Sequence, residues 1–241
     1  MSTTPDGAPA PAPREMAGLI DHTALKPDTD EATVRRVVSE AREHGFAAVC
    51  VNPRWVPLVV AELTGSTVKT CTVVGFPLGA STTASKVAET QEAVAAGAQE
   101  IDMVVDIADA LAGDSAAVET QIRVLADAAH AGGAILKVIL ETALLSEDAK
   151  ELVCRASEAA GADFVKTSTG FAGGGATVED IALMHRLVGG RLGIKASGGV
   201  RSYADAVAMV SAGATRIGAS SSLDIVGADE TTSAPGAADD Y

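Results

Sequence analysis

The sequence predicts a single-domain α/β protein, a (β/α)8 or TIM barrel with disordered termini. The first observation is a repeated local pattern in which a glycine follows a helical stretch and precedes a short apolar run. Three copies share an Ala-Gly-Ala core, at residues 96–98, 160–162 and 212–214. Glycine often ends a helix in a left-handed turn, so each copy predicts a helix followed by a strand. The second observation is that eight such apolar runs occur, spaced by the length of one βα unit.

The eight expected strands are short apolar runs bounded by turn residues. They lie near residues 18–23, 47–51, 68–75, 100–105, 134–140, 164–168, 193–197 and 215–219. Amphipathic or alanine-rich segments between most of them predict helices at residues 30–44, 82–96, 115–131, 147–160, 177–188 and 202–212. The alternative is an open doubly wound sheet, which usually carries a Gly-x-Gly-x-x-Gly turn after its first strand. Residues 21–26 read Asp-His-Thr-Ala-Leu-Lys there, so we favour the barrel.

Composition divides the chain into three parts. Residues 1–13 form an N-terminal tail rich in proline and alanine, residues 14–227 form the barrel, and residues 228–241 form an acidic C-terminal tail. We expect both tails to be disordered, because their composition cannot bury enough apolar surface to offset the entropy of ordering.

The bulk composition also excludes several classes of partner. A net charge of −14 without any basic stripe argues against nucleic acid. The N-terminus lacks the regions of a signal peptide, and no apolar run approaches the ~20 residues of a membrane helix. We therefore expect a cytoplasmic protein that binds no membrane. The three cysteines form no C-x-x-C pair and the four histidines are scattered, so we expect neither a metal site nor a cofactor.

Two lysines carry the strongest chemical signal. Lys166 lies in Asp-Phe-Val-Lys-Thr-Ser-Thr-Gly (163–170) and Lys195 in Gly-Ile-Lys-Ala-Ser-Gly-Gly (193–199), each where a buried strand gives way to a polar loop. Lysine is seldom buried without a partner. A second cation about 5 Å away raises the energy of the charged form by about 3 kcal/mol at an effective dielectric of ~20. One lysine can thus be a neutral nucleophile while the other stays charged, which predicts imine chemistry.

Further polar residues end the other expected strands, where barrel enzymes keep their chemistry. Asp21 ends the first strand, Asp102 lies in the fourth and Lys137 in the fifth. Asp102 has a purely structural alternative, as the ion-pair partner of a lysine. Cys50 ends the second strand and is better interpreted as a small buried apolar residue than as a nucleophile. We expect His22, beside Asp21, to line the mouth of the barrel.

Glycine-rich loops follow the last three expected strands. Gly170 follows the sixth, Gly198 and Gly199 follow the seventh, and Gly218-Ala-Ser-Ser-Ser (218–222) follows the eighth. Loops after strands 7 and 8 commonly bind phosphate through backbone N–H groups in such barrels. The alternative is that they are tight turns without a ligand.

These residues together resemble the deoxyribose-phosphate aldolase family, whose members are class I (Schiff-base) aldolases. The similar segments cover about residues 17–222: LIDHT (19–23), AVCV (48–51), GFPLG (75–79), EIDMV (100–104), LKVILET (136–142), FVKTSTGF (164–171), KASGGVR (195–201) and GASS (218–221). The resemblance implies reversible cleavage of 2-deoxy-D-ribose 5-phosphate to glyceraldehyde 3-phosphate and acetaldehyde, in the catabolism of deoxyribose phosphate. It also implies phosphosugar and aldehyde substrates and a homo-oligomer, either a dimer or a tetramer.

The resemblance also implies a role for each site residue. Lys166 forms the Schiff base, Lys195 favours its neutral amine and relays protons, and Asp102 is the acid/base acting through a water molecule. Asp21 and Lys137, with Cys50 nearby, support this network. The residues implied in phosphate binding are Gly170, Gly198, Gly199, Gly218, Ser220 and Ser221.

Two positions and three alternatives stay open at this point. Some relatives have a lysine where this chain has Phe171, which removes one possible cation for the phosphate. Tyr241 ends the chain, and a role as a lid over the site is a hypothesis. The alternative functions are a Schiff-base aldolase for another phosphosugar, a phosphosugar-binding barrel without turnover, and a metal-dependent class II aldolase. The missing histidine cluster disfavours the last.

Overall fold

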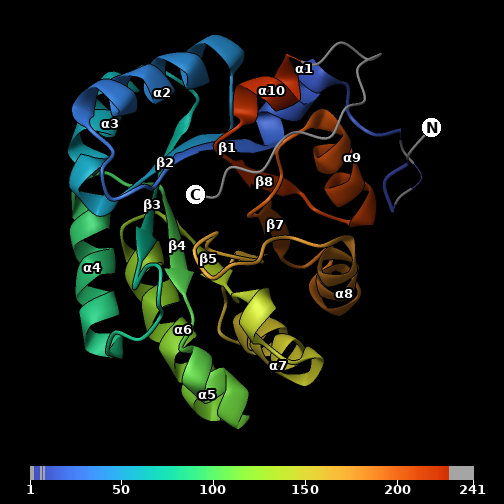
Figure 1. The fold of residues 1–241 in the computed structure, drawn as a ribbon. Coiled ribbons are helices and arrows are strands. Elements are labelled where there is room, and N and C mark those ends of the chain that lie inside the picture. Colours follow the sequence, from blue (N-terminus) through green and yellow to red (C-terminus); the bar gives the residue numbers. More distant parts are fainter. Residues whose placement is uncertain (1–2, 6, 8, 228–241) are drawn as a thin grey trace.

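The computed structural model describes residues 3–5, 7 and 9–227, and within them the chain forms a closed barrel of eight parallel strands (Figure 1). The strands are β1 (Ile20–Ala24), β2 (Ala48–Val51), β3 (Lys69–Val74), β4 (Glu100–Val104), β5 (Ile135–Ile139), β6 (Phe164–Lys166), β7 (Gly193–Ser197) and β8 (Arg216–Ala219). They follow one another around the barrel in chain order, and pairing of Ile20 in β1 with Ile217 in β8 closes it. The predicted (β/α)8 fold is confirmed.

The helices form a layer around the barrel (Figure 1). The six predicted helices are present as α2 (Glu31–His44), α4 (Thr83–Ala95), α6 (Ser115–Ala131), α7 (Glu147–Ala159), α8 (Val178–Val188) and α9 (Tyr203–Ala212). The structure adds α1 (Pro13–Met16), α3 (Val56–Glu62), α5 (Ile107–Ala112) and α10 (Ser222–Val226). Sequence reasoning missed α3 because its Val-Pro-Leu-Val-Val start has the β-branched composition of a strand. The shortness of α5 and α10 hid them from periodicity.

Side-chain caps fix where the six predicted helices begin. In each, the residue before the first turn accepts a hydrogen bond from a backbone N–H of that turn, which has no partner within the helix. The six caps are Asp30, Thr82, Asp114, Ser146, Thr177 and Ser202. Gly45 and Gly213 end α2 and α9 in the left-handed region, with φ of 68° and 119°. The chain is therefore turned back toward the next strand at a predictable residue.

Alternation along the strands separates an apolar shell from a charged interior. Outward residues such as Ile101, Val165 and Ile194 are fully or almost fully buried between the strands and the helices. Inward residues, including Asp102 and Lys166, are one position away on the same strands. The apolar part of the interior is a small cluster of Leu25, Ala48, Cys50, Cys71 and Val73, with Phe76 packed against it.

The described end of the N-terminal tail contacts the barrel. Tyr203 at the start of α9 donates its hydroxyl hydrogen to the carbonyl oxygen of Pro11, and Pro13 is buried. The predicted C-terminal tail, with Tyr241, lies outside the described residues. Within the described part of the chain, no helix is both long and apolar enough to cross a membrane.

Lys86 on α4 is a buried lysine away from the barrel interior. Its Nζ donates to the carbonyl oxygen of Val104 at 2.8 Å and to Oε1 of Gln121 on α6 at 3.0 Å. It makes no ion pair with any carboxylate in the described residues. Burial lowers the pKa of Lys86 to about 8, although Asp106 and Glu89 oppose this shift. A neutral amine has two N–H donors, which match these two acceptors.

We predict that Lys86 makes the free energy of unfolding rise with pH between about 8 and 10.5. The pKa of this lysine is lower in the folded protein than in the unfolded chain. The unfolded chain therefore binds more protons in this range, and up to about 3 kcal/mol of stability is gained as pH rises through it. Urea unfolding at pH 7.5 and 9.5 should show that gain in the unsubstituted protein and a smaller one in Lys86→Met. Lys69→Met removes an exposed lysine and is the control. An equal gain in all three proteins would contradict the prediction.

Candidate active site

Five predicted residues converge inside the barrel because they lie on inward positions of neighbouring strands. Asp102 on β4 is paired in register with Lys137 on β5, and Lys166 on β6 is paired with Lys195 on β7. Asp21 on β1 completes the set across the closure of the barrel. All five are buried: Lys166 has 3% of its surface exposed, and the other four have none. Alternation along each strand turns these residues to its inner face, and barrel closure brings them together.

Asp102 is the centre of this cluster. Its Oδ2 accepts from Nζ of Lys166 at 2.8 Å and from Nζ of Lys195 at 2.7 Å. Its Oδ1 accepts from Nζ of Lys137 at 2.8 Å and from Sγ of Cys71 at 3.3 Å. Burial alone would raise the pKa of Asp102, but the three ammonium groups outweigh it and hold this pKa well below its usual range. The residue is a carboxylate at neutral pH.

A second layer of charges lies below Asp102. Nη1 of Arg216 on β8 donates to Oδ1 of Asp21 at 2.6 Å and to Oε2 of Glu100 at 3.0 Å. Nζ of Lys137 lies 2.6 Å from Oε2 of Glu100, and Lys195 donates to Oδ2 of Asp21. Sequence reasoning did not assign roles to Glu100 and Arg216. The available signal was that Glu100 precedes Asp102 by two residues, which places both on the same face of β4.

The charges balance when Lys166 is left out. Asp21, Glu100 and Asp102 are three carboxylates, and Lys137, Lys195 and Arg216 are three cations. Burial would lower the pKa of Lys195, but Asp102 and Asp21 outweigh burial and raise it above its usual value. Lys195 therefore stays protonated, and Lys166 is the fourth basic group beside three carboxylates.

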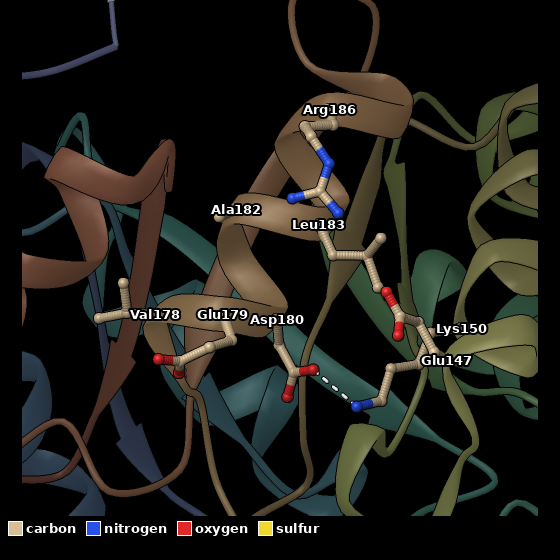
Figure 2. A pocket seen from close by; sticks show the side chains of 8 residues that line it. All are labelled: Glu147, Lys150, Val178, Glu179, Asp180, Ala182, Leu183 and Arg186. Carbon is tan, nitrogen blue, oxygen red and sulfur yellow. Dashed lines mark hydrogen bonds and ion pairs between the residues drawn. The ribbon is translucent and has the colours of Figure 1, made fainter.

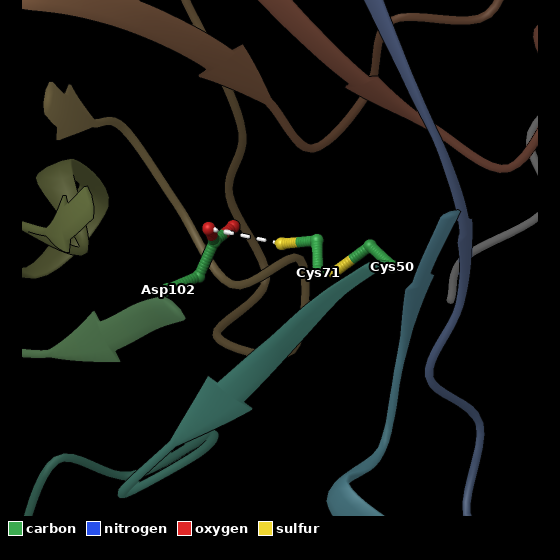
Figure 3. A group of neighbouring side chains, drawn as sticks. All are labelled: Cys50, Cys71 and Asp102. Atoms are coloured by element: carbon green, nitrogen blue, oxygen red, sulfur yellow. Dashed lines mark hydrogen bonds between the residues drawn. The ribbon is translucent and has the colours of Figure 1, made fainter. Parts of the chain in front are cut away.

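Two buried thiols line the interior where β2 and β3 pair. Cys71 on β3 donates to Asp102, and Cys50 on β2 lies beside Cys71 in register (Figure 3). Cys50 belongs to the small apolar interior cluster, as its interpretation as a buried apolar residue predicts. The ligand atoms of Cys50, Cys71 and Asp102 lie within 4.8 Å of one another. Both oxygens of Asp102 already accept from ammonium groups, so this donor set fits a cation poorly.

The glycine-rich loops lie together at the mouth because β6, β7 and β8 are neighbours. The amide of Ala176 donates to the carbonyl oxygen of Gly198 at 2.9 Å, which ties the loop after β6 to the loop after β7. Gly170, Gly198 and Gly199 have φ of 87°, 82° and 78°, a region that other residues rarely adopt. In the loop after β8, Ser220 is exposed and Ser221 half-buried.

Gly218 has a packing role that the sequence did not reveal. A Cβ atom at this position would lie 2.9 Å from Cε of Lys195 and 3.0 Å from Cβ of Ser197. A larger residue would therefore displace the lysine side chain, and only glycine leaves room for it.

His22 does not line the mouth, so that expectation was wrong. Alternation along β1 turns Asp21 into the barrel and His22 out of it. His22 is buried under α2 and α10, where Nε2 lies 2.7 Å from Glu40 and Nδ1 lies 2.9 Å from Ser222.

A groove between α7 and α8 lies on the outer layer (Figure 2). Its lining residues are Glu147, Lys150, Val178, Glu179, Asp180, Ala182, Leu183 and Arg186. Nζ of Lys150 donates to Oδ1 of Asp180 at 2.7 Å, so the central charges pair with each other. No predicted site residue lines this groove.

The fold and the buried lysine–aspartate cluster together define a (β/α)8-barrel aldolase. The family profile for DeoC/LacD family aldolases matches residues 16–228. The chain belongs to this family, which confirms the resemblance seen in the sequence.

Individual relatives agree over nearly the whole chain. A protein named deoxyribose-phosphate aldolase from Micrococcus luteus is 61% identical, with 89% of this chain and 96% of the relative covered. Deoxyribose-phosphate aldolase 1 of Oceanobacillus iheyensis is 52% identical, with 91% and 99% covered. The structure of a putative deoxyribose-phosphate aldolase from Coccidioides immitis superposes with a TM-score of 0.88 at 42% identity, covering 91% of this chain and 87% of that one.

We predict that Asp102→Asn lowers the free energy of unfolding by about 3–5 kcal/mol, because it leaves buried ammonium groups without their shared carboxylate. Urea unfolding at pH 7 measures this loss. Asp114→Asn is the matched control, because Asp114 caps α6 at the surface and asparagine caps helices equally well. Equal stability of the two variants would show that Asp102 is not needed to hold the cluster.

Proposed function

We propose that this protein cleaves 2-deoxy-D-ribose 5-phosphate reversibly to D-glyceraldehyde 3-phosphate and acetaldehyde, through a Schiff base on Lys166. The observation that carries the proposal is the single oxygen of Asp102 that accepts from both Lys166 and Lys195. One lysine is thereby available as a nucleophile beside a second, lasting cation. The name shared by the curated relatives supports the choice of substrate.

The assignment of the nucleophile rests on contacts. Lys195 touches two carboxylates, Asp102 and Asp21, whereas Lys166 touches only Asp102 among the described residues. A neutral Lys166 leaves the remaining cluster with equal positive and negative charge. Lys166 is also the most exposed of the interior lysines, with 4% of its side chain exposed against 1% for Lys195 and none for Lys137. It is therefore the amine that an aldehyde can reach.

The reaction follows from this placement. Nζ of Lys166 adds to the C1 aldehyde of the open-chain sugar, and loss of water gives a protonated imine that withdraws electrons. The C2–C3 bond then breaks as a base removes the proton of the C3 hydroxyl, which releases glyceraldehyde 3-phosphate. The bonding electrons form an enamine, which is protonated at C2. Hydrolysis of the resulting imine releases acetaldehyde and regenerates the amine.

Asp102 and Lys195 serve the proton transfers. Asp102 is ionised at neutral pH, so its carboxylate can accept a proton, through a water molecule, when the C3 hydroxyl is deprotonated. Lys195 donates hydrogen bonds throughout and stabilises negative charge that develops on oxygen. Asp21 and Lys137 hold these two groups in place, and Cys50 contributes an apolar wall.

The phosphate of the substrate would be held at the mouth by backbone N–H groups of the loops after β6, β7 and β8. The residues proposed for this role are Gly170, Gly198, Gly199, Gly218, Ser220 and Ser221. Left-handed glycines allow neighbouring N–H groups to point at one anion. Local dipoles of this kind bind phosphate despite the overall charge of −14.

We further propose a cytoplasmic homo-oligomer, either a dimer or a tetramer. A relative from Aeropyrum pernix, 36% identical with a TM-score of 0.84 and covering 90% of this chain and 91% of that one, is described as a tetramer. Light scattering of the purified protein measures the assembly directly.

We predict that acetaldehyde and borohydride leave an N-ethyl group on Lys166, detected by peptide mass mapping. Deoxyribose 5-phosphate with borohydride should block this labelling when added first. Lys166→Met should abolish both labelling and turnover, whereas Lys150→Met, in the outer groove, should retain both. An adduct on Lys195 would overturn the assignment of the nucleophile. Absence of any adduct would favour a phosphosugar-binding barrel, and turnover only of other phosphosugars would overturn the substrate.

We predict that Phe171→Lys lowers the KM for deoxyribose 5-phosphate roughly two- to fivefold, by adding a partly exposed cation at the mouth. Phe171 is 38% exposed and packs edge-to-face on Phe76, with ring centroids 5.3 Å apart. Phe171→Leu removes the aromatic pair without adding charge and is the control. Steady-state kinetics with deoxyribose 5-phosphate and with unphosphorylated deoxyribose test the effect. A similar fall in KM for both sugars would contradict it.

A further inference from the structure

A hydrogen-bond network joins α2 to Ser222, the first residue of α10, through the buried side chain of His22. Nε2 of His22 lies 2.7 Å from Oε2 of Glu40, and Nδ1 lies 2.9 Å from Oγ of Ser222. Glu40 also accepts from Arg36 at 2.7 Å, and the ring of His22 packs on Phe46 with centroids 5.1 Å apart. This hydrogen-bond network lies outside the barrel, so the aldolase chemistry does not use it.

Ser222 is the end of this hydrogen-bond network that lies next to the mouth of the barrel. Its hydroxyl lies 3.0 Å from the carbonyl oxygen of Ala219, and His22 and Ala219 are paired in register between β1 and β8. The contact closes a turn whose two inner residues are Ser220 and Ser221. Ser222 is fully buried, whereas Ser220 is exposed at the mouth. The anchored residue and the proposed ligand-facing residues thus belong to one turn.

The protonation of His22 follows from its partners. Burial lowers the pKa of His22, and Glu40 opposes this only in part, so the ring is neutral at pH 7. The carboxylate of Glu40 can only accept, so the ring proton is on Nε2. Nδ1 is then an acceptor, and the Ser222 hydroxyl donates to it and to the oxygen of Ala219 in a shared bond. Glu40 therefore selects the tautomer that holds Ser222.

A serine, a histidine and a glutamate in contact also make up a nucleophilic triad, but this set cannot act as one. Ser222 has no exposed surface, and its hydroxyl is engaged by two acceptors. No substrate can reach its oxygen. The arrangement can hold a turn in place, and it offers no reactive group.

We propose that Glu40, His22 and Ser222 are positioning residues that hold the Ser220–Ser221 turn in the conformation that binds phosphate. The proposal rests on the proposed function, because it takes the phosphate of the substrate to lie on this turn. It predicts that breaking the hydrogen bonds between Glu40, His22 and Ser222 weakens binding of the phosphate group and leaves the chemistry at Lys166 intact. A purely structural role would instead affect phosphorylated and unphosphorylated sugars alike.

Ser222→Ala and His22→Leu test the proposal, with His22→Asn as the conservative variant that keeps a polar atom near the position of Nδ1. We expect the first two to weaken binding of inorganic phosphate, and to raise the KM for deoxyribose 5-phosphate, roughly five- to tenfold. Cleavage of unphosphorylated deoxyribose should stay within a factor of about two. His22→Asn should restore part of the loss. His44→Leu is the control, because His44 also packs on Phe46 but is exposed and lies outside the hydrogen-bond network.

Calorimetry with inorganic phosphate on the resting enzyme separates this proposal from the proposed function. Loss of phosphate binding in Ser222→Ala, with the Lys166 adduct intact, supports the positioning role. Unchanged phosphate binding in both Ser222→Ala and His22→Leu overturns it, as does an equal loss of activity on both sugars. Should His22→Leu fail to fold, Ser222→Ala still decides, since it removes a single buried oxygen. Absence of the Lys166 adduct in the unsubstituted protein counts against the proposed function alone.

Discussion

The shared carboxylate of Asp102 is the interaction on which the interior of this barrel depends. The Nζ atoms of three lysines lie within 2.8 Å of its two oxygens, in a space almost closed to solvent. An isolated ammonium in such a place would lose its proton or force the site open. Asp102 alone cannot balance Lys137 and Lys195, so Asp21, Glu100 and Arg216 in the layer below complete a set of three carboxylates and three cations. The chemistry at Lys166 depends on that balance.

The fold supplies this balance by alternation. Each strand places apolar residues toward the helices, and charged residues one position away inside the barrel. The shell provides the hydrophobic stabilisation that offsets the cost of a buried charged interior. Cys50 and Cys71 fill the interior along β2 and β3, the two strands that contribute no charged group to the cluster, and Cys71 donates to Asp102.

The pKa of a buried basic group in this protein depends on the residues that it contacts as well as on its burial. Lys195 and Lys86 are equally buried, yet two carboxylates raise the pKa of Lys195, whereas burial beside neutral oxygens lowers that of Lys86. His22 remains neutral because burial outweighs its contact with Glu40. Lys195 belongs to the charged interior of the barrel. Lys86 and His22 lie outside the barrel interior and make polar contacts between its strands and helices.

The sequence by itself determined the eight strands, the six longer helices, and the strands that carry Asp21, Asp102, Lys137, Lys166 and Lys195. It could do so because helix caps, glycine turns and strand alternation are local features. Only the tertiary structure decided that Glu100 and Arg216 complete the charge balance, that Gly218 makes room for Lys195, and that His22 turns outward to hold Ser222. The Arg216–Asp21 and His22–Ser222 contacts depend on pairing β8 with β1, which joins residues 195 and 200 positions apart. The place of Gly218 against Lys195 depends on pairing β8 with β7. No local pattern carries that information, because closure and register are properties of the whole barrel.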